Sequence, residues 1–431
     1  MNDAAPATSA NAARATSAHA AHVAVVAAAL GNVLEWFDLA VYGFFAAVIG
    51  REFFPTGDEA TELLASFAAF GVGFLARPLG GILIGRLGDV KGRRTSLLLT
   101  IFLMATGTVL IGVTPSYARI GIAGPVIIVF ARLMQGFSAG GEWGGATAFM
   151  VEWSEPGRRG FYGSLQQVGV VAGVLLGSIT GATVNTLLSP EHVAAWGWRI
   201  PFLFGGIIGP VGMYMRRNIA ETPAFREAAP ASVAVTAETV GLTARAAGFT
   251  ILWTVAFYIY INYMPTFTHT YAGLSSAQAL WSNSLGIAVL LCAVPVMGHL
   301  SDRVGRRPLL LACCAAFIVL PYPAARLLVS APPFAVIAAC QVMFGLVLSL
   351  FSGAGPSAIA EIFPTGSRST LMSAGNALAT AIFGGFASYI ASWLIVKTGN
   401  PIAWVAYVMS AAVVTGLVIL TLKETAHEPL R

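Results

Sequence analysis

The chain has 431 residues, of which 57% are hydrophobic and only 10% are charged, and its mean hydropathy is +0.77. This composition excludes an ordinary soluble domain, because so few charged residues cannot cover a water-exposed surface. The formal net charge of +5 is better explained by membrane topology than by nucleic-acid binding.

Twelve apolar runs are long enough to cross a bilayer, which needs roughly 20 predominantly apolar residues per helix. A backbone in lipid must close its own hydrogen bonds, so each run is expected to be a helix. The 47 glycines suit close packing between such helices. In chain order the runs are 22–49, 60–85, 95–114, 122–149, 160–186, 200–215, 246–268, 278–299, 308–328, 333–356, 370–395 and 402–422.

The runs divide the chain into two six-helix halves, 22–215 and 246–423. Residues 1–21, rich in Ala, Ser and Thr, predict a disordered cytoplasmic tail that is retained, because the apolar stretch that follows is itself the first span. Segment 216–245 mixes acids, bases and prolines with alanines and predicts a cytoplasmic linker. Residues 424–431 form a short cytoplasmic tail.

Basic residues fix the expected orientation, since Lys and Arg near span ends are retained on the cytoplasmic side. With the N-terminus inside, seventeen of the 24 basic residues lie in cytoplasmic segments. Only Arg51, Arg119, Arg326 and Lys397 fall outside. The sequence therefore predicts a membrane protein with both termini in the cytoplasm.

A ten-residue phrase occurs twice, as GRLGDVKGRR at 85–94 and GHLSDRVGRR at 298–307. A half-chain repeat in an apolar sequence is typical of duplicated transporters. The recurring aspartates are expected to end helices 2 and 8, and the arginine pairs can bridge to acids on neighbouring helices and close the inner face. A purely topological role would explain the arginines but not the glycines and aspartates in register. The predicted gate comprises Gly85, Asp89, Gly92, Arg93, Arg94, Glu152, Asp302, Arg306, Arg307, Glu361 and Arg368.

Charged side chains inside spans are costly and are functional candidates by default. Glu35 and Asp38 stand three residues apart, which places both carboxylates on one face of helix 1. Two acids in a low dielectric favour a protonated form, so the pair predicts proton coupling, with Asp38 favoured. Either acid could instead be a permanent ion-pair partner. Glu142 in helix 4 is a third candidate for coupling.

Three arginines are candidates for binding a substrate anion, because a guanidinium stays charged and holds a carboxylate bidentately. Arg77 lies near mid-membrane, although it could equally neutralise Glu35 or Asp38. Arg132 lies in helix 4, and Arg199 at the outer end of helix 6, where an interface role is as plausible. The neutral cavity candidates are Gln135, Gln166, Tyr258, Tyr260 and Asn262.

Other chemistry is not indicated. The four cysteines, Cys292, Cys313, Cys314 and Cys340, all lie in predicted spans and are interpreted as structural thiols. No metal-ligand spacing, phosphate-binding loop or nucleophile motif is present, so the sequence predicts neither an enzyme nor a cofactor.

The repeated phrase resembles the loop signature of the major facilitator superfamily, and RLMQG at 132–136 resembles its second motif, which is associated there with proton coupling. Further phrases resemble the metabolite:proton symporter family of bacterial inner membranes: GNVLEWFDLAVYGFF at 31–45, ARPLGG at 76–81, WGWRIPF at 196–202 and EIFPTGSRS at 361–369. That family includes carriers for citrate, 2-oxoglutarate, shikimate, and proline or betaine.

The resemblance implies a proton symporter that works by alternating access without a cofactor, and we expect it to function as a monomer. Some phrases, such as LATAIFGG at 378–385, are similar to the citrate and 2-oxoglutarate carriers, whereas YMPTF at 263–267 is similar to the proline/betaine carrier. The leading hypothesis is uptake of a di- or tricarboxylate such as citrate. The alternatives are uptake of a zwitterion such as proline or betaine, drug efflux and, from other classes, a receptor or membrane enzyme.

Overall fold

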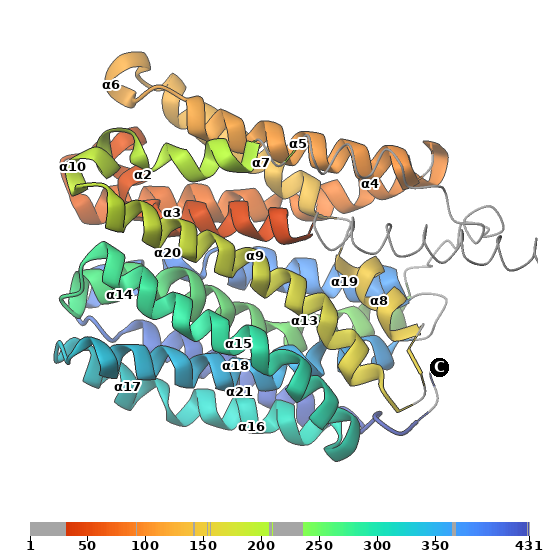
Figure 1. The fold of residues 1–431 in the computed structure, drawn as a ribbon. Helices are drawn as coiled ribbons and strands as arrows, with labels where there is room; N and C mark the ends of the chain where they lie inside the picture. The colour runs from red at the N-terminus through yellow and green to blue at the C-terminus, as the bar shows by residue number, and fades with distance from the viewer. Residues whose placement is uncertain are drawn as a thin grey trace, which may run out of the picture.

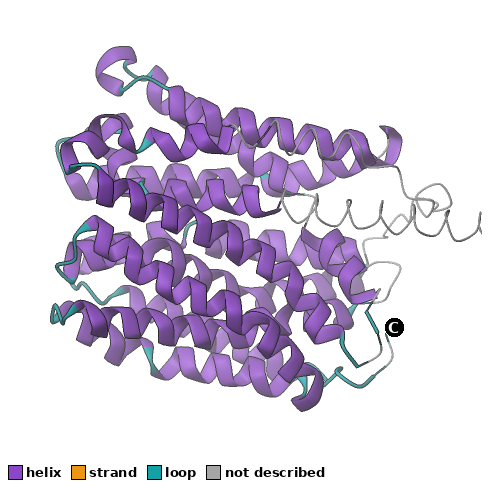
Figure 2. Ribbon diagram, in the orientation of Figure 1, coloured by secondary structure: helices purple, strands orange, loops and turns teal. Residues whose placement is uncertain are grey.

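The computed structural model describes residues 32–91, 93–140, 143–152, 154–155, 157–206, 209, 236–363, 368–428 and 430. Within these ranges the regular structure is entirely helical (Figure 2). The helices of the first half are Asn32–Phe44, α2 (Ala46–Phe53), α3 (Glu59–Leu75), α4 (Arg77–Lys91), α5 (Arg93–Val113), α6 (Tyr117–Ile120), α7 (Ala123–Ala139), α8 (Trp143–Glu152), α9 (Arg159–Leu187), α10 (Pro190–His192), the π-helix η1 (Val193–Gly197) and a helix at 199–206.

The second half begins with a helix whose N-terminus is capped by side chains. Thr236 and Thr239 form a reciprocal capping box that starts this helix, α13. The helices of the second half are α13 (Ala237–Phe257), the π-helix η2 (Tyr258–Tyr263), α14 (Met264–Tyr271), α15 (Ser276–Val304), α16 (Arg306–Val319), α17 (Pro321–Val329), α18 (Phe334–Ile362), α19 (Arg368–Ala379), the π-helix η3 (Thr380–Gly384), α20 (Ala387–Thr398) and α21 (Trp404–Thr421).

Helices in the described residues correspond to all twelve predicted runs. Seven helices or continuous helix runs are long and apolar enough to cross a membrane, and two bent helix pairs add two more spans. The remaining three runs are represented by the shorter apolar helices of α5 (Leu98–Val113) and α7 (Ala123–Ala139) and by the described residues 199–206 of the sixth run. The protein is therefore an all-helical membrane protein with twelve spans, as the apolar runs predicted.

One helix boundary differs clearly from the predicted one. The seventh span begins at Ala237, inside the segment expected to be linker, because the capping box at Thr236 starts the helix there. Only residues 216–235 of the predicted linker remain outside the described residues. The tail 1–21 and the start of the first predicted span also lie outside them.

Two of the three helix breaks within these spans lie beside a proline. Ala76 separates α3 from α4, and Pro78 occupies the first turn of α4, where its missing N–H is tolerated. In the ninth span α16 and α17 meet at 41°, and α17 begins at Pro321. The first span bends by 65° between Phe44 and Ala46. These breaks place Ala76 and Arg77 midway along the second span.

The two halves lie side by side with their helices roughly parallel (Figure 1). The long helix α9 of the first half packs along α15 and α18 of the second. Both repeated loops lie at the same end of the bundle, at the right of Figure 1. This end, which carries residues 85–94 and 298–307, is called the repeat face below, and the other end the opposite face.

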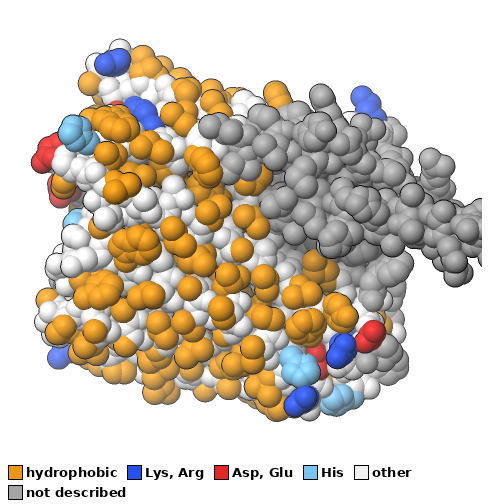
Figure 3. All heavy atoms as spheres, in the orientation of Figure 1, with side chains coloured by type: hydrophobic (Ala, Val, Ile, Leu, Met, Phe, Trp, Pro, Cys, Tyr) orange, Lys and Arg blue, Asp and Glu red, His pale blue; other side chains and the backbone are white. Residues whose placement is uncertain are grey.

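The outer surface matches a protein surrounded by lipid. Hydrophobic side chains cover the middle of the face shown in Figure 3, whereas the charged side chains visible there gather toward the two ends. Large apolar residues such as Ile82, Leu187 and Leu417 are more than half exposed. In water such a continuous apolar surface would aggregate, so it indicates a lipid-facing belt.

Glycine pairs bring helices into contact at equivalent places in the two halves. A Cβ on Gly136 would lie 1.6 Å from the carbonyl oxygen of Gly73, and one on Gly345 would lie 2.4 Å from that of Gly286. At these distances the backbones must move apart to admit even a methyl group. The duplicated sequence therefore builds the same close helix crossing twice.

We expect Gly136→Ala to destabilise the protein by about 1–3 kcal/mol, because the added carbon overpacks a backbone contact that cannot yield. The matched control is Gly241→Ala, since a Cβ there would meet nothing within 4 Å. The measurement is thermal unfolding of both purified variants in detergent. An unchanged midpoint for Gly136→Ala would contradict the close crossing.

Candidate transport and gating sites

Asp38 begins a buried hydrogen-bond chain through the first half. The Thr108 hydroxyl of α5 donates to the Asp38 carboxylate. Gln135 Nε2 donates to Thr108 Oγ1 at 2.9 Å, and Arg132 Nη1 donates to Gln135 Oε1 at 2.7 Å. All four side chains are buried. The chain links an acid on the first span to a guanidinium on α7 through neutral groups.

Arg132 is held inside the first half by aromatic rings. Its guanidinium carbon lies 4.6 Å from the centroid of Tyr42 and 4.7 Å from that of Phe70. A guanidinium between ring faces is stabilised by cation–π attraction even where water is excluded. This environment favours a role for Arg132 in the Asp38 chain over the predicted contact with substrate.

Arg77 pairs with Glu35 rather than with Asp38. Arg77 Nη2 lies 3.9 Å from Glu35 Oε1, and both side chains are nearly buried. The Arg77 guanidinium also lies 4.3 Å from the centroid of Phe74. Within the described part of the chain, Arg77 Nε and Nη2 have no hydrogen-bond partner. The pairing favours the neutralising role that the sequence left open, while two donors remain available to a ligand.

Aromatic rings from both halves meet beside Arg77. This central aromatic cluster comprises Trp36, Phe70, Phe74, Phe257 and Tyr258. The centroid of Trp36 lies 5.3 Å from that of Phe257 and 6.5 Å from that of Tyr258, and Phe74 and Tyr258 lie 5.3 Å apart. Tyr258 begins the π-helix η2, a type of irregularity that is frequent at functional sites. The rings join the halves midway between the two faces.

The other predicted cavity residues are more scattered. Arg199 donates to Glu52 at 3.1 Å and to the carbonyl of Thr114 near the opposite face, so these contacts favour the interface role over substrate contact. Buried Gln166 accepts from Gln167 at 2.7 Å. Tyr260 packs within the second half, where the centroid of its ring lies 3.9 Å from that of Phe344. Glu142 lies outside the described residues.

The second repeated loop closes the repeat face with charged groups. Arg306 pairs with Asp302 at 2.8 Å and with Glu361 at 3.2 Å, and all three are buried. Asp302 also accepts the backbone N–H groups of Gly160 and Phe161, at 2.7 and 3.0 Å. Those amides lie at the N-terminus of α9, so Asp302 joins the second half to the positive end of a first-half helix.

Further contacts cross between the halves at this face. Arg368 pairs with Glu152 at 2.6 Å, and Arg159 lies 3.6 Å from Glu361. The Ser357 hydroxyl donates to the carbonyl of Arg159 at 2.8 Å. Glu152 and Glu361 were expected to occupy corresponding positions in the two halves and to pair with arginines. Each of them binds an arginine of the other half. In the first loop, Gly92 and the side chains of Asp89, Arg93 and Arg94 lie outside the described residues; Gly85 lies in α4.

The C-terminal segment forms hydrogen bonds with the second repeated loop. Glu424 accepts the backbone N–H groups of Arg306 and Arg307, each at 2.9 Å. Burial raises the pKa of Glu424, but these and neighbouring backbone donors outweigh it and lower the pKa below its ordinary value. A lowered folded-state pKa contributes stability that is lost only as the pH falls through it, so Glu424 remains ionised at neutral pH. Arg307, expected in the gate, here joins α16 to the end of α21, since its guanidinium donates to Leu420.

Contacts also close the opposite face. Ser178 and Ser284 hydroxyls lie 2.8 Å apart, and Trp281 donates to Thr186 at 3.1 Å. A Cβ on Gly43 would lie 2.0 Å from the Asn262 side chain. Inter-half contacts at both faces, with the aromatic cluster between them, describe an occluded arrangement.

We expect Asp302→Asn to open the repeat face, because an amide cannot accept two backbone donors and pair with Arg306 at once. A single cysteine at Ser164, which is buried beside Gly298, reports the opening in a background without the four native cysteines. Labelling should become severalfold faster, whereas Arg303→Gln, an exposed change on the same helix, should have no effect. Unchanged labelling in Asp302→Asn would leave the loop a topological role only.

Several residues of these sites were missed in the sequence. Thr108, Trp36 and Arg159 carry no distinctive spacing: Thr108 is a hydroxyl in an apolar run, Trp36 is an aromatic in a family phrase, and Arg159 resembles a topological charge. Glu424 lies in the predicted tail. Their roles depend on which helices become neighbours, which a single sequence does not state.

A twelve-span protein with two similar halves, contacts between them at both faces and a buried acid in one half has the architecture of a secondary transporter. Residues 23–240 match the family model described as "Sugar (and other) transporter", and residues 284–431 match that of the Major Facilitator Superfamily. The chain belongs to the major facilitator superfamily, and within it to the metabolite:proton symporters.

Relatives support this assignment. The chain is 36% identical to the glycine betaine/proline/ectoine/pipecolic acid transporter OusA of Dickeya dadantii, over 94% of this chain and 84% of that one. It is 37% identical to the citrate-proton symporter of Klebsiella pneumoniae, over 91% and 89%. A solved structure of the xylose transporter XylE from E. coli, in a partially occluded inward-open conformation, superposes with a TM-score of 0.77 at 16% identity, covering 94% of this chain and 98% of that one. The protein is a proton-coupled symporter.

Proposed function

We propose that the substrate is a small zwitterion such as betaine or proline, bound between the halves at Arg77 and the central aromatic cluster. The observation that carries this proposal is the Arg77–Glu35 pair: Arg77 Nε and Nη2 make no hydrogen bond within the described residues, and the guanidinium lies over the ring of Phe74, which packs against Tyr258. A carboxylate can take the free donors of Arg77, and a cationic end can meet Glu35 and the ring faces.

Charge balance favours this class of substrate over a tricarboxylate. Arg132 is held by aromatic rings and Arg199 by Glu52, so Arg77 is the cation of the predicted substrate group that lies beside the interface. Several negative charges facing one guanidinium and Glu35 would be poorly compensated in a low dielectric. A di- or tricarboxylate such as citrate remains the second candidate, supported by the citrate-proton symporter relative and by the free donors of Arg77.

We propose Asp38 as the proton carrier. It lies away from the interface, yet only three residues from Glu35 on the same helix. Protonation of Asp38 would change the charge of the chain that ends at Arg132, and hence the packing of the first span against α5 and α7. The distribution of basic residues supports insertion in a bacterial inner membrane with both termini in the cytoplasm, so the repeat face is the cytoplasmic one. We propose that the monomer is sufficient for transport.

Ligand-induced thermal stabilisation separates the two substrate classes. A ligand that binds only the folded state raises the unfolding free energy by about 2.7 kcal/mol at a concentration one hundred times its Kd. We expect betaine or proline to raise the unfolding temperature of the purified protein, and citrate and 2-oxoglutarate to leave it unchanged. Stabilisation by citrate alone would overturn the zwitterion proposal in favour of the second candidate.

A further inference from the structure

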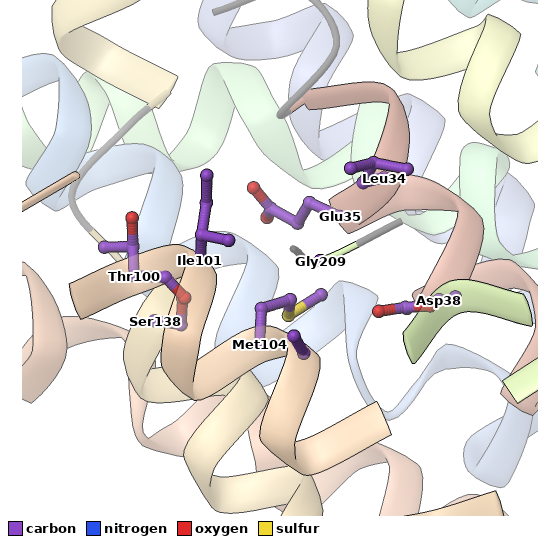
Figure 4. Close-up of a pocket in the computed structure, with 10 residues that line it drawn as sticks. Leu34, Glu35, Asp38, Thr100, Ile101, Met104, Ser138 and Gly209 are labelled. Atoms are coloured by element: carbon purple, nitrogen blue, oxygen red, sulfur yellow. The ribbon is translucent and has the colours of Figure 1, made fainter. Parts of the chain in front are cut away.

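A pocket beside Asp38 lies within the first half, and its mostly apolar lining includes several polar side chains (Figure 4). Glu35, Asp38, Thr100, Met104, Ser138 and Gly209 are among the residues that line it. The lining residues that the structure describes come from the first span, α5, α7 and the sixth span, all in the first half. The pocket thus lies within the first half and meets the proposed substrate site at Glu35.

The pocket runs from Asp38 toward the repeat face. On α5, which starts at that face, Thr100 and Ile101 line the pocket and precede Thr108. On α7, which runs toward that face, Ser138 follows Gln135. Glu35 lies on the same side of Asp38 in the first span. Each of these helices thus lines the space on the repeat-face side of the hydrogen-bond chain.

Asp38 presents a free oxygen to this space. Thr108 donates to Oδ2, whereas Oδ1 has no partner within the described residues. A Cβ on Gly205 of the sixth span would lie 2.6 Å from Oδ1, so a glycine is what leaves this oxygen room. Ser138 donates to the carbonyl of Thr100 at 2.6 Å, so polar atoms also stand further along the route.

The equivalent position in the second half lacks this chemistry. Gly136 and Gly345 make equivalent helix crossings, and four residues before each stand Arg132 and Gln341. Gln341 carries no charge, and its Nε2 has no partner among the described residues. The ionisable hydrogen-bond chain is thus a feature of the first half.

We propose that the pocket is a proton-release route that runs within the first half from Asp38 to the repeat face, beside the substrate site at Glu35. In this step the O–H bond of protonated Asp38 breaks, a water oxygen in the pocket takes the proton, and the electron pair stays on the carboxylate, which Thr108 stabilises. The charged and titratable groups around Asp38 are Glu35 and Tyr42 on its own helix, Arg132 on α7 through Gln135 and Thr108, and Arg77 on α4 beyond Glu35. The inference rests on the proposed role of Asp38.

The test compares two kinds of transport in proteoliposomes. Counterflow exchanges labelled for unlabelled substrate without net proton release, whereas accumulation driven by a proton gradient requires release in every cycle. Ala105→Leu narrows the pocket, and Thr100→Val removes a hydroxyl while keeping the volume. The matched control is Val113→Phe, on an exposed part of the same helix.

We expect both pocket variants to slow gradient-driven uptake about a hundredfold, the lower end of the usual range for losing a proton-transfer group, while counterflow changes less than twofold. The control should change neither rate. Equal loss of both rates in Thr100→Val, or normal driven uptake in both pocket variants, would overturn the route. If Asp38→Asn still accumulates substrate, the role of Asp38 has failed. If Asp38→Asn does not accumulate substrate but the pocket variants do, only the route has failed.

Discussion

Asp38→Asn should abolish accumulation against a gradient while leaving counterflow in place. One proton moving down 100 mV releases about 2.3 kcal/mol, which corresponds to about 50-fold accumulation of a neutral zwitterion. Asparagine can still accept from Thr108, so the hydrogen-bond chain to Arg132 survives, but it cannot take up a proton. The steady-state ratio of internal to external substrate should therefore fall to about one.

The measurement is uptake of labelled betaine into proteoliposomes with an imposed inward proton gradient. Asp58→Asn is the matched control, because Asp58 is an exposed cap of α3 and asparagine caps helices equally well. Full accumulation by Asp38→Asn would exclude Asp38 and shift the role to Glu35, the other acid that lines the same pocket.

Arg77→Gln should remove substrate binding and destabilise the protein at once. Removing one partner of a buried ion pair typically costs about 3–5 kcal/mol, because the other charge stays uncompensated. Adding Glu35→Gln should restore most of the stability, since no buried charge then remains. The double variant should still fail to bind substrate, because the Arg77 donors for the substrate carboxylate are missing.

Stability and affinity must be measured on the same purified samples, by thermal unfolding and by calorimetry with betaine. Arg51→Gln is the control, since Arg51 makes an exposed contact with Glu59. If the double variant binds betaine normally, Arg77 has only a structural role. In that case the substrate carboxylate must be held by another group.

Sequence periodicity was enough to predict the fold. Hydrocarbon thickness fixes the length of an apolar helix, so the runs marked the twelve spans, and the repeat at 85–94 and 298–307 identified the halves. Helix ends were less predictable: α13 starts at Ala237 because of a local capping box that lies inside a polar segment.

The sites were predictable only as a set of unusual residues. Charge inside a span singled out Asp38, Arg77 and Arg132, because such residues are costly in lipid. Their partners were not predictable, since Thr108 and Phe74 are ordinary in their own helices and matter through packing between helices. The pairing of Arg77 with Glu35 rather than Asp38 likewise depends on how the first two spans pack together.

The most direct test of the central claim, proton-coupled uptake of a small zwitterion, is the pH change that substrate itself produces. Betaine added to lightly buffered vesicles containing the protein should make the external medium alkaline, as protons enter with the substrate. The change should vanish with a protonophore and in Asp38→Asn, and citrate should produce none. Betaine uptake with no pH change, or uptake that requires sodium instead of protons, would contradict the account.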